Sequence, residues 1–404
     1  MSRSPHHPDH SKTLLVLACY FKGNRFLEQA KKRGAYIFLL TQEWLSKEPW
    51  AHESIDGFFA QMNQPPLRAT INTAAYLSRG LRFDSVVGLD DFDVETAAAL
   101  REHLCLPGMD ASHARFFRDK LACRTELERL GVRVPEFTRT VNDAEVRAFT
   151  ERVPAPWMLK PRSEASATGI HKVHSADELW GLLHQKGDDR SFFILEKYLP
   201  GDVFHVDSLT VDGQVLFAEA HRCVTPPFNV AHTGGIYASA TVQRGSQDEK
   251  NLRVLNARAI AALGFQNGVT HIEFIKSQED GEFYLLETAA RVGGAHTSDL
   301  VEAATGINLW AEWANIEIDG PNYKLPERRF DHAGLLMTLS RTEHPDLSSF
   351  DAPEVVFQSP EKWHAGLVLA SESAERVAAL LTDYRERLLR DHTAVLPAPD
   401  KPTH

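Results

Sequence analysis

The sequence predicts an α/β domain followed by regions of α+β structure. Three observations carry this prediction. First, residues 13–40 alternate strand, helix and strand, which implies a parallel sheet. Second, Asp212-Gly213 separates two apolar runs and is the strongest short signal for a β-hairpin. Third, 404 residues are too many for one ordinary core, so two or three domains are expected.

The first part of the chain predicts a domain at 13–110, behind a polar, proline-containing tail at 1–12. Its strands are short apolar runs, and helical patterns follow them in turn. The loop after the first strand, CYFKGNRF, holds one glycine and not the pattern G-x-G-x-x-G, so a dinucleotide site is poorly supported. The expected strands are 13–18, 35–40 and 84–88, and the expected helices are 24–32, 72–79 and 94–103.

The rest of the chain predicts three further regions, 111–200, 201–330 and 331–404, the last ending in a loose Pro-rich tail. Hairpins are frequent in them, and two or three more strands are expected from about residue 333. The expected helices are 116–130, 177–184, 252–263, 298–305 and 375–390. The expected strands are 157–160, 192–196, 204–211, 214–221, 269–276 and 282–287.

Composition narrows the function classes. Hydrophobic content of 43% with 25% charged residues is ordinary for a soluble globular protein. A net charge of −11 argues against nucleic acid or an anionic membrane as the main partner. The four cysteines form no CxxC pair, which favours reduced thiols in the cytoplasm. No apolar run approaches the ~20 residues of a membrane span.

Two glutamates face each other in one predicted hairpin. If 279–281 is a three-residue loop, Gln278 pairs with Glu282, and its glycine takes the left-handed position. Counting back from there places Glu273 directly opposite Glu287. Cross-strand partners share a face, with Cβ atoms ~5 Å apart. The two carboxylates therefore repel one another unless something positive lies between them.

This pair has two interpretations. One is a divalent cation or a shared proton, and Mg²⁺ fits because it takes one or two carboxylates together with waters and substrate phosphates. The other is a solvated sheet face with Lys276 and Arg291 as counterions. Beside a metal–phosphate cluster, Arg291 would neutralise charge that develops during phosphoryl or acyl transfer. The pair Gly293-Gly294 lets backbone approach a ligand closely.

Two further segments have the residues of a nucleotide site. In WMLKPRSEASATGI, Lys160 ends a strand before a loop of small residues that could fold over phosphates. In FFILEKYLPG, a strand ends in Glu196 and turns at Pro200-Gly201. Backbone groups there, with Tyr198 and Leu199 alongside, could hold an adenine. Taken alone, the first segment can also be an ordinary Ser/Gly loop after a strand. The second can equally be a strand that simply turns at Pro200-Gly201.

The order of the motifs resembles the ATP-grasp superfamily. They run D-K, G-V-x-V-P, strand-Lys-Pro with a small-residue loop, E-K-Y-L-P-G, H-x-E and E-x-x-x-R-x-G-G, over residues 14–390. The resemblance implies two α+β subdomains that clamp ATP, at 111–200 and 201–330. They lie behind an N-terminal α/β domain and before a small C-terminal closing subdomain. It also implies phosphorylation of a carboxylate to an acyl phosphate, which an amine then attacks.

The resemblance assigns roles to individual residues. Phosphate contacts are expected from Lys120, Lys160, Ser166, Thr168 and Gly169. The adenine hinge is expected at Glu196, Lys197, Tyr198 and Leu199. Mg²⁺ or Mn²⁺ is expected at Glu273 and Glu287, and the acid substrate near Arg291, Gly293, Gly294 and His296. The candidate catalytic residues are Arg291, Lys160 and His232.

Two departures from the family pattern weaken this transfer. The usual third metal ligand, an Asn, is Ala289 here, and the ribose-binding acid would fall at Val203, with Asp202 adjacent as a substitute. His205 and His271 alternate with apolar residues and are interpreted as structural histidines.

The favoured function is an ATP-dependent carboxylate–amine ligase acting on amino acids or a related small acid. A carboxylating or purine-synthesis enzyme and a catalytically silent ATP-binding regulator remain as alternatives. A homodimer is expected only as the family habit.

Overall fold

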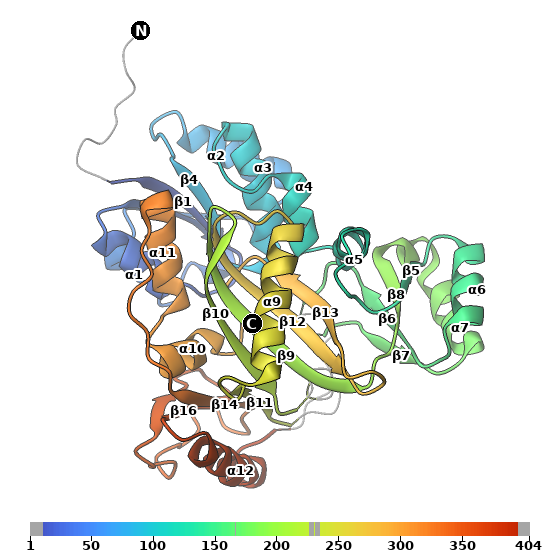
Figure 1. Cartoon of the computed structure of the whole chain (residues 1–404). Helices are drawn as coiled ribbons and strands as arrows, with labels where there is room; N and C mark the ends of the chain where they lie inside the picture. Colours follow the sequence, from blue (N-terminus) through green and yellow to red (C-terminus); the bar gives the residue numbers. More distant parts are fainter. Residues whose placement is uncertain (1–10, 166, 226–229, 231–234, 395–404) are drawn as a thin grey trace.

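The structure is a computed structural model, which describes residues 11–165, 167–225, 230 and 235–394. Three sheets and the helices that cover them make up this part of the chain (Figure 1). Two residues that the sequence singled out, Ser166 and His232, lie outside the described residues.

The first sheet is parallel and has the strand order β3-β2-β1-β4. The predicted alternation of strands and helices is confirmed, because β1 and its neighbours are apolar runs buried on both faces. The strand β3 escaped prediction, since its residues are half exposed and sit at the sheet edge. The elements are β1 (Thr13–Ala18), α1 (Asn24–Lys32), β2 (Tyr36–Gln42), β3 (Gly57–Gln61), α2 (Leu67–Leu77), β4 (Ser85–Gly88), α3 (Val94–Leu104) and α4 (Ala111–Ala114).

The second sheet is antiparallel, in the order β5-β8-β6-β7, and stands to one side of the molecule with α6 and α7 (Figure 1). Its core joins Val146 and Phe149 of α6 to Leu159 and Leu195 on the strands. The elements are α5 (Lys120–Arg129), β5 (Phe137–Arg139), α6 (Asp143–Arg152), β6 (Trp157–Pro161), β7 (His171–Val173), α7 (Ala176–Lys186) and β8 (Phe193–Lys197).

The third sheet has eight antiparallel strands in the order β13-β12-β9-β10-β11-β14-β16-β15. Both predicted hairpins belong to it, and it continues without a break across the expected boundary near residue 330. Its strands are β9 (Gly201–Val211), β10 (Gln214–Cys223), β11 (Tyr237–Thr241), β12 (Gly268–Ser277), β13 (Phe283–Ala289), β14 (His332–Leu339), β15 (Val355–Gln358) and β16 (His364–Ser371).

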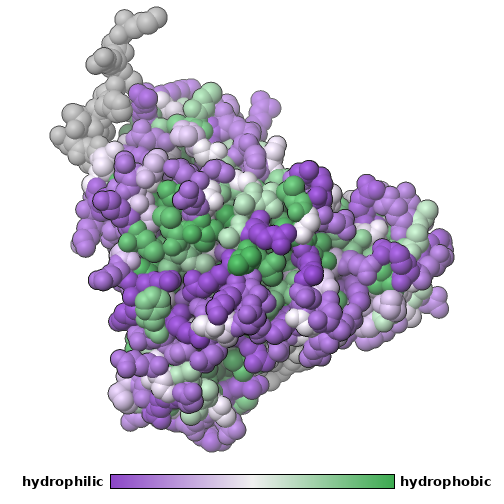
Figure 2. Space-filling view, in the orientation of Figure 1, coloured by the Kyte–Doolittle hydropathy of each residue, from purple (hydrophilic) through white to green (hydrophobic). Residues whose placement is uncertain are grey.

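Helices cover both faces of the large sheet. They are α9 (Gln247–Ala262), α10 (Thr297–Thr305), α11 (Leu309–Asp319) and α12 (Ala374–Asp391). Alternate residues of β14 show the two sides, because Leu335 packs with α10 whereas Leu336 packs with α12. On the α11 side, Phe26 of α1 meets Trp313 edge to face, which joins the first sheet's layer to the large sheet. Figure 2 shows a mostly hydrophilic face, with apolar side chains gathered near its centre. Among the described residues, no helix is both long enough and apolar enough to cross a bilayer.

Candidate active site

Two carboxylates face each other at one edge of the large sheet. Glu273 of β12 lies directly opposite Glu287 of β13, as the sequence predicted. Neither is buried, since their side chains are 28% and 36% exposed. The pair therefore lies on an accessible face rather than in the core.

The predicted register is right at this pair but wrong at the loop. Pairing ends at Ser277, whose N–H donates to the carbonyl of Glu282 over 2.9 Å, so the loop has one residue more than expected. A β-bulge compensates, because Leu286 is an extra residue in β13 between the partners of Phe274 and Glu273. The longer loop and the bulge shift the register by one residue in opposite directions, so Glu273 and Glu287 remain opposite each other.

Lys120 supplies part of the positive charge that the pair needs. It is the first residue of α5, which begins later than predicted because Asp119 caps the helix through the N–H groups of residues 121 and 122. Its Nζ lies 2.8 Å from Glu287 Oε1 and 2.8 Å from the carbonyl oxygen of Glu164. One lysine thus joins the carboxylate pair to the loop that follows β6.

The carboxylate pair offers oxygen ligands of the kind that a divalent cation takes. Lys276, expected as a counterion, binds Asp248 instead, with Nζ 2.7 Å from Oδ1. In the described part of the chain, no Lys or Arg forms an ion pair with Glu273. Of the two carboxylates, Lys120 is bound to Glu287 alone, and among the described residues Glu273 pairs only with His271, whose Nε2 lies 3.8 Å from Oε1. The two accessible carboxylates offer the oxygen ligands that a hard cation takes.

Arg291 is anchored by a residue that the sequence analysis missed. Its Nη2 and Nε lie 2.6 and 2.8 Å from Asp91 Oδ2, in the loop after β4. Burial raises the pKa of Asp91, but the charges of Arg291 and Arg118 outweigh it and hold the pKa below its usual range. The ion pair ties the first sheet to the end of β13. The acidic run GLDDFD at a strand end was the available signal.

Lys160, Glu196 and Arg124 form a buried charged cluster. Glu196 Oε2 lies 2.6 Å from Lys160 Nζ, and its Oε1 accepts from Arg124 Nε at 2.9 Å. Arg124 also donates to the carbonyl of Leu286. Burial raises the pKa of Glu196, yet the two cations more than offset this and lower it. Both oxygens of the carboxylate are therefore engaged, which leaves hinge contacts to backbone groups.

The predicted hinge comprises the last two residues of β8 and the two residues after it. Lys197 Nζ lies 2.5 Å from Glu279 Oε2, at the tip of the β12–β13 hairpin. Leu199 is buried in an apolar cluster with Val203 and Ile275, which gives this region a hydrophobic bed. Asp202 is half exposed and pairs with Arg222 at 3.0 Å.

The small-residue loop lies between β6 and β7. Gly169 has a left-handed backbone (φ +68°), which other residues adopt only with strain. Thr168 is buried, and its Oγ1 has no hydrogen-bond partner in the described part of the chain. A buried hydroxyl without a partner is costly, so a ligand oxygen is a suitable acceptor.

The Gly-Gly segment packs differently at its two glycines. A Cβ on Gly293 would lie 2.8 Å from His271 Nδ1, whereas one on Gly294 would meet nothing within 4 Å. His296 stands between Asp299 and Glu361, at 2.9 and 3.6 Å. Burial lowers the pKa of His296, but the hydrogen bonds and charges of both acids raise it to about 9.

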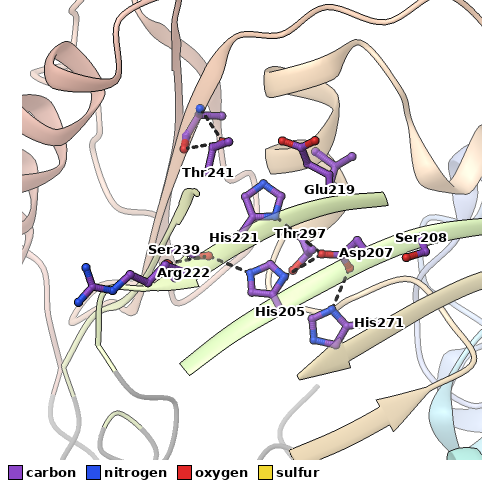
Figure 3. Close-up of polar contacts among 12 residues, drawn as sticks. His205, Asp207, Ser208, Glu219, His221, Arg222, Ser239, Thr241, His271 and Thr297 are labelled. Carbon is purple, nitrogen blue, oxygen red and sulfur yellow. Dashed lines mark hydrogen bonds and ion pairs between the residues drawn. The ribbon is translucent and has the colours of Figure 1, made fainter. Parts of the chain in front are cut away.

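A buried histidine–aspartate cluster lies on the same sheet face (Figure 3). Asp207 accepts from His205 Nδ1 at 2.7 Å and from His271 Nδ1 at 2.8 Å. His205 also contacts Ser239 Oγ through Nε2 at 2.8 Å, so its interpretation as a satisfied structural histidine is confirmed. His221 stacks on His205 with ring centroids 4.9 Å apart. Only His271 of these three points its other nitrogen toward Glu273, at 3.8 Å.

Comparison with known proteins agrees with these features. A sequence profile described as ATP-grasp domain matches residues 153–299. The chain contains an ATP-grasp domain. It is 25% identical over 242 residues to the L-arginine-specific L-amino acid ligase of Bacillus subtilis. This alignment covers 58% of each chain. It is 27% identical over 173 residues to the D-alanine–D-alanine ligase of Neisseria gonorrhoeae, covering 42% of this chain and 56% of that one. The alignments thus span little more than half of these relatives.

Solved structures extend the likeness to nearly the whole chain. The crystal structure of an L-amino acid ligase from Bacillus licheniformis superposes with a TM-score of 0.77 at 18% identity, covering 96% of this chain and 99% of that one. An N5-carboxyaminoimidazole synthetase from Staphylococcus aureus gives 0.72 at 13% identity, with 93% and 98% covered. The fold around the ATP-grasp domain is therefore the ATP-grasp fold, as the sequence predicted.

Proposed function

We propose that this protein is an ATP-dependent carboxylate–amine ligase. It would join an amino acid, or a related small acid, to an amine through an acyl phosphate, and release ADP and phosphate. The observation that carries the proposal is the facing pair Glu273 and Glu287, which Lys120 connects to the loop after β6. The relatives named as L-amino acid ligases support the same reaction class.

The nucleotide would lie between the second sheet and the large sheet. Lys120, Lys160 and the loop with Thr168 and Gly169 would hold its phosphates by point charge and N–H groups. Backbone groups of Lys197 and Leu199, with Tyr198 beside them, would hold the adenine, and Asp202 the ribose. Glu273 and Glu287 would hold Mg²⁺ or Mn²⁺. When bound, that ion would neutralise part of the negative charge on the transferred phosphoryl group.

Arg291 would stabilise the charge that develops at the reacting carbonyl. A substrate carboxylate oxygen attacks the γ-phosphorus and ADP leaves. The amine nitrogen then attacks the carbonyl carbon, phosphate leaves, and the amine gives up a proton. Asp91 keeps the guanidinium charged and fixed before the reaction, so little reorganisation is needed. His232 stays a candidate for the proton, and the acid would lie near Gly293, Gly294 and His296.

The first test is ADP and phosphate release with Mg²⁺-ATP across amino acids, singly and in pairs, with mass spectrometry of the products. Glu287→Gln should lower turnover at least about a hundredfold, because it removes a charged metal ligand and the ion pair of Lys120. Glu282→Gln is the matched control, an exposed glutamate on the same hairpin, and should behave as wild type.

The product distinguishes the alternatives. A product one water lighter than the sum of two substrates supports the ligase. ATP consumption that needs bicarbonate supports a carboxylating enzyme instead. Nucleotide binding without turnover for any acid or amine contradicts the ligase reaction on these substrates and favours a regulatory protein.

A further inference from the structure

The strand β3 is an open edge of the first sheet. It pairs with β2 on one side, and in the described part of the chain no backbone group of residues 57–61 forms a hydrogen bond on its other side. Such an edge offers a row of N–H and C=O groups to any extended chain that reaches it. Folded proteins usually block these edges with charged residues, prolines, a bulge or a covering segment.

The usual protections are missing from β3. Residues 57–67, GFFAQMNQPPL, contain no charged side chain, and their two prolines come only after the strand has ended. The register with β2 runs from Gly57 to Gln61 without a bulge. Phe58 and Phe59 are 37% and 44% exposed. A bare, hydrophobic edge of this kind is expected to associate with another strand.

Apolar side chains surround this edge on both faces of the sheet. Phe59 lies opposite Leu40, so it points to the face on which α2 packs, whereas Phe58 points to the other face. The exposed large apolar residues of the segment 44–76 are Trp44, Phe58, Phe59, Met62, Leu67 and Tyr76. Isolated exposed apolar residues are normal, but a concentration around one open strand indicates an interaction site.

The absence of charge on β3 favours a second copy of this chain as the partner. A strand that pairs with its own copy about a two-fold axis brings each residue near itself, so any charge on it meets a like charge. An uncharged strand has no such repulsion. Antiparallel pairing of all five residues of β3 places its central residue, Phe59, opposite the Phe59 of the other copy, and Phe58 opposite Ala60. Aromatic pairs in such positions stabilise a sheet.

We propose that the protein forms a two-fold homodimer in which the β3 strands of two copies pair antiparallel, with Phe59 at the axis. The two parallel first sheets then join into one sheet that is antiparallel only at the join, and mixed sheets of this kind are common. The strand β4, whose following loop holds Asp91, lies at the opposite edge of the first sheet from β3. The dimer therefore leaves each active site within its own chain, and the inference is independent of the ligase reaction.

The test is sedimentation velocity of the full chain at micromolar concentration, where we expect the wild type to sediment as a dimer. Phe59→Lys should raise the dissociation constant of the dimer at least about a hundredfold, because each dimer loses two phenylalanines and gains two facing ammonium groups. Phe59→Glu should act in the same way. An equal mixture of the two variants should recover the dimer, since lysine then faces glutamate. Val254→Lys, at an exposed apolar position on α9, is the matched control and should remain a dimer.

Three results would overturn the inference. The first is a wild type that sediments as a monomer, and this measurement needs no variant. The second is a dimer that persists in Phe59→Lys, because the interface would then lie elsewhere. The third is a mixture of the two variants that stays monomeric, which contradicts the pairing of Phe59 with itself. Near-ultraviolet circular dichroism checks that each variant keeps the native packing, as expected for a substitution at an exposed side chain.

Discussion

Single charged residues decide the shape of this site. Arg124 reads in the sequence as one more charge on a helix, yet its side chain is fully buried between Glu196 and the carbonyl of Leu286. Asp91 looks like part of a solvated acidic run, yet it anchors Arg291. A sequence pattern assigns charges to helix faces, but it does not show which face a distant segment will cover.

Gly293 and Gly294 offer a matched pair of substitutions. Gly293→Ala should destabilise the unliganded protein by about 1–3 kcal/mol, because the new Cβ would lie 2.8 Å from His271 Nδ1 and 2.9 Å from Thr297. Gly294→Ala should change stability little, since its Cβ meets nothing within 4 Å. Urea unfolding measures both. Equal effects would mean that the close approach at Gly293 is not what requires glycine there.

At the scale of elements, a bulge and a loop together place Glu273 opposite Glu287. Without the extra residue at Leu286, the longer loop would shift the register by one and turn Glu287 to the other face. Helix termini also position side chains, since Asp119 caps α5 at the point where Lys120 reaches the loop after β6.

The start of α10 should make stability depend on pH. The pKa of His296 is about 9 in the folded protein, against about 6.5 for an unperturbed histidine, because Asp299 and Glu361 outweigh burial. A raised folded pKa gives stability that is fully present below about pH 6.5 and is lost as pH rises through about 9.

His296→Asn removes this titration. The wild type should be more stable relative to the variant at pH 6 than at pH 10. The difference in their free energies of unfolding should change by at most about 3 kcal/mol between these two pH values. Urea titrations across this range measure the difference, and other titrating groups cancel between the two proteins. A constant difference between wild type and variant across the range would contradict the assignment.

At the scale of the whole molecule, the site is assembled from segments far apart in the chain. Lys120, Glu196 and Glu287 come from three different elements, and Asp91, in the loop after β4, pairs with Arg291. A nucleotide that contacts both the second sheet and the large sheet should therefore stabilise the native chain as a unit.

A non-hydrolysable ATP analogue with Mn²⁺ should raise the melting temperature by a few degrees. At a hundred times its Kd, a ligand that binds only the folded state adds about 2.7 kcal/mol. Glu287→Gln should reduce this shift, and Glu282→Gln should not. Differential scanning calorimetry measures it, and an unchanged melting temperature at saturating analogue would contradict the proposed nucleotide site.

The sequence alone determined those features of this protein that depend on residues close together in the chain. Apolar periodicity located most strands and helices, and the turn at Asp212-Gly213 and the hairpin count brought Glu273 opposite Glu287. These features depend on residues close in the chain, where backbone geometry limits the choices. The motif order added the fold class for the same reason, since each motif is a local strand end or loop.

Only the tertiary structure decided which distant groups meet. The pairing of Arg291 with Asp91, the burial of Arg124 and the ring of His271 held by Asp207 join residues up to 200 positions apart. Charges attract any opposite partner, so no local pattern selects among the many available. The choice comes from close packing of the sheets and helices, which fixes the few places where a buried charge can find its counterion.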